Sequence, residues 1–119
     1  MNASETVSAL GALAHEHRLA IYRLLVERGP DGLPAGEIAD RIGLVPSSLT
    51  FHVQALQRSG LVTQRRVSRQ VFYAADFAAM SDLIAYLTKN CCGEGSACAP
   101  ACKPSTAVAK SNSRTRRIA

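Results

Sequence analysis

Four cysteines fall within a short stretch near the end of the chain, and the preceding 90 residues contain none. They are Cys91, Cys92, Cys98 and Cys102. A reduced cysteine is usually a small buried apolar residue, but the glycines, prolines and charged residues around these four cannot build a core. Thiolates select soft ions such as Zn(II), Cu(I) and trivalent metalloids. The cluster therefore predicts a soft-ion site or a set of redox-active thiols.

The charges are distributed unevenly along the chain. The net charge is +5, and residues 41–75 alone carry five arginines and no acidic residue. A basic stretch inside a folded domain favours a polyanionic partner such as nucleic acid.

Length and composition limit the class of protein. With 119 residues and 47% hydrophobic residues, the chain suits one globular domain with a modest core and is not disordered throughout. No apolar run approaches the roughly 20 residues that span a bilayer. Residues 1–5 also lack the features of a signal peptide. We expect a cytoplasmic protein with no membrane contact and with reduced thiols.

The spacing of apolar residues predicts helices in the first part of the chain. We expect Ser4 to cap a first helix that breaks near His15 and has Val7, Leu10 and Leu13 on one face. A second helix should end at Arg28, before Gly29 and Pro30.

A helix-turn-helix followed by a hairpin is predicted next. Residues 36–42 and the helix beginning at Pro46 are short and are separated by a tight break. Residues 61–66 and 70–74 read as strands, and a last helix begins near Asp76. The fold class is thus mainly α with a small β-hairpin wing, a winged helix-turn-helix. The wide apolar stripe of the last helix favours a homodimer.

Residues that can contact DNA lie on the second helix of the pair and on the hairpin. Short hydroxyl and amide side chains reach the major groove, and arginines grip phosphates or enter the minor groove. His52 either contacts a phosphate or is a hydrogen-bonded residue packed beside the core. The candidates are Ser47, Ser48, Thr50, Phe51, His52, Gln54, Arg65, Arg66 and Arg69.

Several motifs together resemble the ArsR/SmtB family of metal-responsive repressors. The opening motif is Leu13-Ala-His-Glu-His-Arg-Leu-Ala-Ile21, and the helix-turn-helix motifs span residues 36–44, 46–53 and 56–62. The resemblance covers about residues 7–90. It implies a homodimer with contacts from the first and last helices, Leu10 and Ile84 included. It also implies operator DNA contacts from Ser47, Ser48, Thr50 and His52, and release of DNA when an inducer binds.

Two familiar inducer sites of that family do not transfer to this chain. Many arsenic sensors carry Cys-x-Cys at the start of the helix-turn-helix, where residues 33–37 contain no thiol. Zinc and nickel sensors use Asp and His along the last helix, where Asp76 and Asp82 occur without a histidine. We therefore expect the inducer site to be at the C-terminal cysteines.

Trivalent arsenic fits these cysteines best, because it takes three thiolates in a pyramid. We expect Cys91, Cys92 and Cys98 to bind arsenite or antimonite, with Cys102 as an alternate ligand. Structural zinc usually needs four ligands in paired C-x2-C knuckles, and adjacent side chains such as those of Cys91 and Cys92 are expected to diverge.

Other functions remain open at this stage. Methylarsenite, which offers only two positions for thiolates, would need Cys91 and Cys92 alone. Thiol oxidation, for example between Cys92 and Cys98, is a further alternative. An enzyme is not expected, with no catalytic residues and no required cofactor, because the cysteines follow a helix C-terminus, whose dipole disfavours a thiolate. The domains are expected at 1–90 (DNA binding and dimerisation), 91–102 (inducer binding) and 103–119 (a disordered basic tail).

Overall fold

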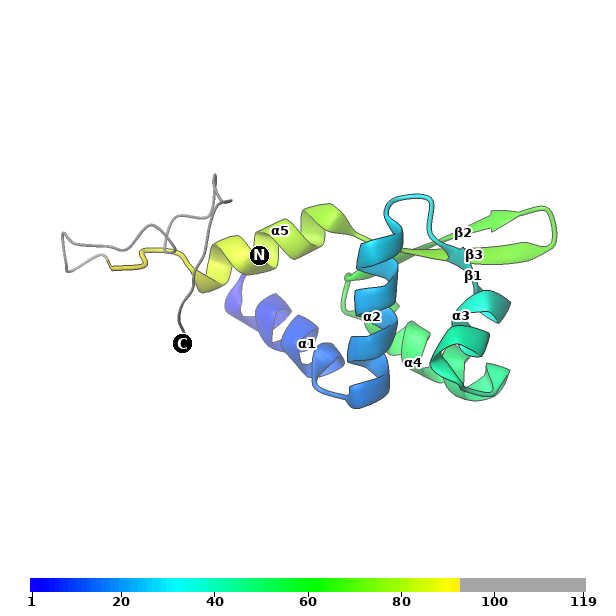
Figure 1. Ribbon diagram of the computed structural model, residues 1–119. Helices are drawn as coiled ribbons and strands as arrows, with labels where there is room; N and C mark the ends of the chain where they lie inside the picture. Colours follow the sequence, from blue (N-terminus) through cyan, green and yellow to red (C-terminus); the bar gives the residue numbers. More distant parts are fainter. Residues whose placement is uncertain (93–119) are drawn as a thin grey trace. The chain divides into compact units, whose positions relative to one another are not determined.

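The computed structural model describes residues 1–92 (Figure 1). It divides into two units, residues 1–83 and the chain from Ile84 onward. The elements in order are α1 (Ala3–Leu13), α2 (Glu16–Arg28), β1 (Leu33–Pro34), α3 (Ala35–Ile42), α4 (Pro46–Arg58), β2 (Val62–Val67), β3 (Gln70–Ala75) and α5 (Phe77–Leu87). Cys98, Cys102 and the expected tail at 103–119 lie outside the described residues.

The first helix begins two residues earlier than the sequence indicated, and its N-cap is Asn2 rather than Ser4. Asn2 and Glu5 form a reciprocal capping box, in which each side chain accepts a hydrogen bond from the other residue's backbone N–H. This arrangement satisfies two backbone donors at once, which a serine at position 4 would not do. The buried face of α1 consists of Thr6, Ala9 and Ala12.

The expected break near His15 is confirmed, since α1 ends at Leu13 and α2 begins at Glu16. His15 is the N-cap of α2, and its ring Nδ1 accepts a hydrogen bond from the backbone N–H of His17 at 3.1 Å. Gly29, with φ of 97°, ends the helix.

The helix-turn-helix has the expected form. Gly43 takes a left-handed conformation (φ 84°) that ends α3, and Pro46 opens α4 at a position that needs no backbone donor. The apolar stripe of α4 is buried, as expected, at Leu49, Val53 and Leu56.

The sheet has three strands rather than the two of the expected hairpin. Its order is β1-β3-β2, and Leu33 pairs with Tyr73 in antiparallel fashion. Gly32 permits this pairing, because it has φ of +74° and a Cβ there would lie 2.3 Å from the carbonyl oxygen of Tyr73. A strand of two residues containing proline carries too little sequence pattern to be predicted.

The core lies between the helices and the sheet. Its largest fully buried side chains are Ile21, Leu25, Ile38, Leu49, Val53, Leu56 and Leu61. Asp76 caps α5 by accepting a hydrogen bond from the Ala79 N–H, and Leu83 of this helix is buried. Among residues 1–92, no helix is long and apolar enough to cross a membrane.

Candidate nucleic-acid interface

The outer face of α4 is polar with one large aromatic ring. Ser47, Thr50, Phe51 and Gln54 are exposed, and Phe51 keeps 61% of its surface accessible. On the opposite face of the helix, the apolar stripe of Leu49, Val53 and Leu56 packs into the core. Ser47 and Gln54 can hydrogen-bond to phosphates or base edges, as the first residues of a recognition helix do. The Thr50 hydroxyl donates to the Pro46 carbonyl oxygen at 3.0 Å and can still accept a hydrogen bond. Ser48 is half-buried beside them.

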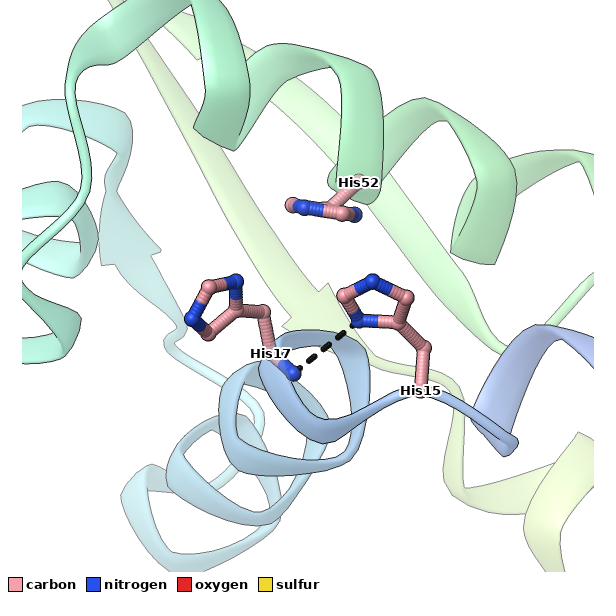
Figure 2. Close-up of side chains that lie close together, drawn as sticks. All are labelled: His15, His17 and His52. Carbon is pink, nitrogen blue, oxygen red and sulfur yellow. Dashed lines mark hydrogen bonds between the residues drawn. The ribbon is translucent and has the colours of Figure 1, made fainter.

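His52 differs from the other candidates on α4, because only 8% of its surface is accessible. Its ring packs against His15, with the two centroids 4.6 Å apart, and against His17 at 5.6 Å (Figure 2). Burial lowers its pKa, and the positive neighbours His15, Arg18 and His17 lower it further. The structure thus turns His52 toward α2, away from the exposed face of α4.

The expected wing arginines occupy two different settings. The Arg65 guanidinium donates a hydrogen bond to the Asp31 carbonyl oxygen at 2.6 Å and lies 5.0 Å from the Phe72 ring centroid. Arg66 and Arg69 are exposed further along the hairpin. Arg65 is therefore anchored to the Asp31 loop and beside Phe72 of β3, whereas Arg66 and Arg69 present their charge to solvent.

A side-chain contact joins the wing to the recognition helix. The Gln57 amide of α4 donates to the Gln64 side-chain oxygen of β2 at 3.0 Å. This contact adds a polar link between the wing and α4.

The first two cysteines follow α5 directly. Cys91 and Cys92 are exposed, and their Sγ atoms lie 3.7 Å apart. The expectation that these adjacent side chains diverge is therefore wrong. Cys92 has a left-handed backbone (φ 58°), which departs from the regular geometry on which that expectation relied.

The structure reveals one cluster that the sequence did not predict. His15, His17 and His52 each place one ring nitrogen within 4.8 Å of the other two. Of the two roles predicted for His52, the structure fits a residue packed beside the core, and the phosphate contact stays a prediction. Its buried Nδ1 makes no hydrogen bond to any of residues 1–92.

Comparisons with known proteins agree with this architecture. Residues 13–65 match a family model described as a helix-turn-helix domain. The transcriptional activator HlyU of Vibrio cholerae is 33% identical over 91 residues, which span 76% of this chain and 82% of HlyU. The biofilm growth-associated repressor of Xylella fastidiosa strain 9a5c is 30% identical over 92 residues, or 77% of this chain and 78% of the repressor.

Solved structures show the same fold. HlyU from Vibrio cholerae N16961 superposes with a TM-score of 0.59 at 35% identity, over 72% of this chain and 94% of that one. An ArsR-like transcriptional regulator from Rhodococcus sp. RHA1 gives a TM-score of 0.61 at 29% identity, over 71% and 76% of the two chains.

Fold and relatives together define the class. The protein is a winged helix-turn-helix DNA-binding transcription regulator and not an enzyme. Within that class, the chain belongs to the ArsR/SmtB-type family.

Proposed function

We propose that the protein is a repressor that binds operator DNA as a homodimer and releases it when trivalent arsenic binds to its thiolates. The ligands are Cys91, Cys92 and Cys98, and antimonite acts in the same way. One observation carries the proposal: two exposed Sγ atoms lie 3.7 Å apart directly after the last helix.

The distance between these sulfurs suits a shared soft ion. Around a tetrahedral zinc ion, bonds of about 2.3 Å put two thiolate sulfurs roughly 3.8 Å apart, so sulfurs at 3.7 Å are close enough for one soft ion to bind both. Two thiolates at this spacing need only a third to complete the pyramid of As(III), and Cys98 supplies it. Zinc is the main competing ion to be tested, and it would require a fourth ligand.

Exposed apolar side chains on both terminal helices support the homodimer. On α1, Val7 is 69% and Leu10 is 42% accessible. On α5, Ile84 is 47% and Leu87 is 56% accessible. A twofold dimer that covers these side chains would present two recognition helices to half-sites about 34 Å apart.

Backbone hydrogen bonds connect Cys91 to the exposed residues of α5. The Cys91 N–H donates to the Thr88 carbonyl oxygen at 2.9 Å, and the Thr88 N–H donates to the Ile84 carbonyl oxygen at 3.0 Å. Drawing Cys91 onto a metalloid therefore reshapes the last turn of α5, which carries Leu87. The ligand shifts the dimer away from its DNA-binding state only if it binds the other state more tightly.

The experiment is fluorescence anisotropy of the reduced full chain on the DNA upstream of its own gene, at fixed salt because phosphate contacts make affinity salt-dependent. Arsenite, antimonite, methylarsenite and zinc are titrated in turn. We expect release by arsenite and antimonite, loss of that response in Cys91→Ser and Cys98→Ser, and a normal response in the matched control Cys102→Ser. Normal release from Cys91→Ser and Cys98→Ser would show the site assignment to be wrong.

The same assay tests the DNA surface. Arg66→Ala should weaken binding to all sequences and reduce the salt slope by about 2, because a homodimer loses one phosphate contact from each protomer. Arg23→Ala is the matched control, because Arg23 is paired with Glu27 along α2 at 3.4 Å. Equal effects of the two substitutions would contradict a specific role for the wing.

Thiol oxidation is the second candidate function, because the described cysteines Cys91 and Cys92 are exposed and one solved structure is described as reduced HlyU. Hydrogen peroxide would accept two electrons and two protons from Cys92 and Cys98, giving a disulfide and two waters. DNA release by peroxide without any metal, reversed by dithiothreitol, would identify this mechanism in place of metalloid binding.

A further inference from the structure

All three histidines of the chain meet at one place in residues 1–83. The sequence contains no others, and the three ring nitrogens nearest one another lie within 4.8 Å. His15 and His17 come from the start of α2, and His52 comes from the recognition helix α4 (Figure 2). We propose that these three imidazoles form a binding site for a first-row divalent metal ion, separate from the thiol site.

The donor set suits such an ion. Neutral imidazole is a preferred ligand of Zn(II), Ni(II) and Cu(II), and three histidines with one open position form a known zinc arrangement. Zinc–nitrogen bonds are about 2.0–2.1 Å long. The three ring nitrogens lie within 4.8 Å of one another, so the rings must move closer together to share one ion. His15 and His17 are exposed and can rotate toward a metal, whereas the buried His52 supplies a fixed ligand.

The buried imidazole is prepared for this role. Its Nδ1 has less than 1 Å² of accessible surface and makes no hydrogen bond to any described residue. A buried polar atom without a partner is costly, and a metal bound through this nitrogen would remove that cost. A neutral imidazole is the form that binds metals. Arg18 is one of the positive charges beside His52 and opposes a cation, so we expect weaker binding than at a closed structural site.

Metal binding at this place would act on the helix that reads DNA. His15 caps α2 through its Nδ1, which accepts the His17 N–H. Neutral imidazole that accepts at Nδ1 carries its proton on Nε2. Bonding a metal through either nitrogen of His15 therefore requires this cap hydrogen bond to be given up. The ion would replace that bond and fasten the start of α2 to α4, whose outer face carries Thr50 and Gln54.

Zinc is the probe, and the ring nitrogen signals of the histidines in the NMR spectrum are the readout, with no histidine tag on the full chain. We expect the three rings to shift together and to saturate at one equivalent. The same shifts should appear in a variant with all four cysteines replaced by serine, because the thiols take no part. His17→Gln should weaken binding at least tenfold.

The matched variant at the cap is His15→Asn, which removes the imidazole but keeps a side chain that caps helices well. We expect it to fold like the parent chain and to bind zinc at least tenfold more weakly. Three results would each overturn the proposal: no ring shifts with zinc, ring shifts that vanish when the cysteines are removed, or unchanged zinc affinity in both His15→Asn and His17→Gln.

Discussion

The histidine cluster and the cysteine pair are two candidate ligand sites that are assembled in different ways. His52 reaches His15 only because α4 packs against α2, so that site exists only in the folded domain. Cys91 and Cys92 are neighbours in the chain, and the turn after α5 is enough to place their sulfurs 3.7 Å apart. A site built by long-range packing should be lost when the core unfolds. A site built by local sequence should survive.

The strongest test of this difference is a cavity in the core. Leu25 is fully buried, and Leu25→Ala should destabilise the fold by about 2–5 kcal/mol. Leu19→Ala, at a position that is 48% exposed, is the matched control and should change stability by less than about 0.5 kcal/mol. Both values come from urea unfolding followed by circular dichroism.

Ligand binding measured along the same urea series sharpens the test. Zinc binding by the histidines should disappear across the unfolding transition and should do so at lower urea in Leu25→Ala. Arsenite binding by the thiols should continue beyond the transition. If both activities were lost together, the cysteine site would depend on the fold as much as the histidine site does.

The close approach of Gly32 to β3 offers a second test within residues 1–83. Gly32→Ala should cost about 2 kcal/mol or more, because the residue has φ of +74° and the new Cβ would meet the Tyr73 carbonyl oxygen at 2.3 Å. Gly36→Ala is the control, since nothing lies within 4 Å of its Cβ position and alanine favours the helix. A Gly32→Ala chain as stable as the parent in urea would show that β1 does not need this close approach.

These contrasts also explain which features the sequence could predict. The stripe of Leu49, Val53 and Leu56 is local and periodic, and Pro46 and Gly43 mark helix ends by their own backbone chemistry. The positions of α2, α3, α4 and the hairpin followed from such signals.

Features that depend on distant contacts could not be predicted in this way. The strand β1 has only two residues, and its pairing with β3, rather than any β-propensity of its own, makes it a strand. Val7 and Leu10 share the periodic face expected to pack, yet they are exposed, because the small residues Ala9 and Ala12 are the ones that allow close packing of α1. The histidine cluster is likewise a product of tertiary packing, and no spacing along the chain indicates it.

The helix cap within the histidine cluster gives the next largest effect. His15→Ala removes the acceptor for the His17 N–H and should cost about 1 kcal/mol. His15→Asn should restore most of that stability, because asparagine is a strong N-cap. Urea unfolding of the two variants measures the difference, and equal losses would mean that His15 stabilises the protein through its ring contacts instead.

A pH dependence follows from His52. Its pKa is lowered from 6.5 by burial and then by His15, Arg18 and His17, so the folded chain binds fewer protons there than the unfolded chain. The stability due to the neutral ring is present above pH 6.5 and is lost as the pH falls below 6.5 toward the lowered pKa. Unfolding free energies of the parent chain and His52→Gln, compared between about pH 5 and 8, should diverge only on the acidic side. Parallel profiles would contradict this assignment.

The smallest effect is expected at the end of α5, where Asn90 has φ of 60°. Asn90→Ala disfavours this left-handed turn, but a helix end opens locally without unfolding the core. Global stability should therefore change by less than about 0.5 kcal/mol, in contrast to Gly32→Ala, although both positions have positive φ.

Hydrogen exchange should instead report faster opening at Thr88 and Cys91, whose N–H groups donate within this turn. Because the same turn brings the two sulfurs together, arsenite affinity should fall while zinc binding by the histidines stays constant. A global destabilisation as large as that of Gly32→Ala would show that the cysteine turn unfolds together with the core.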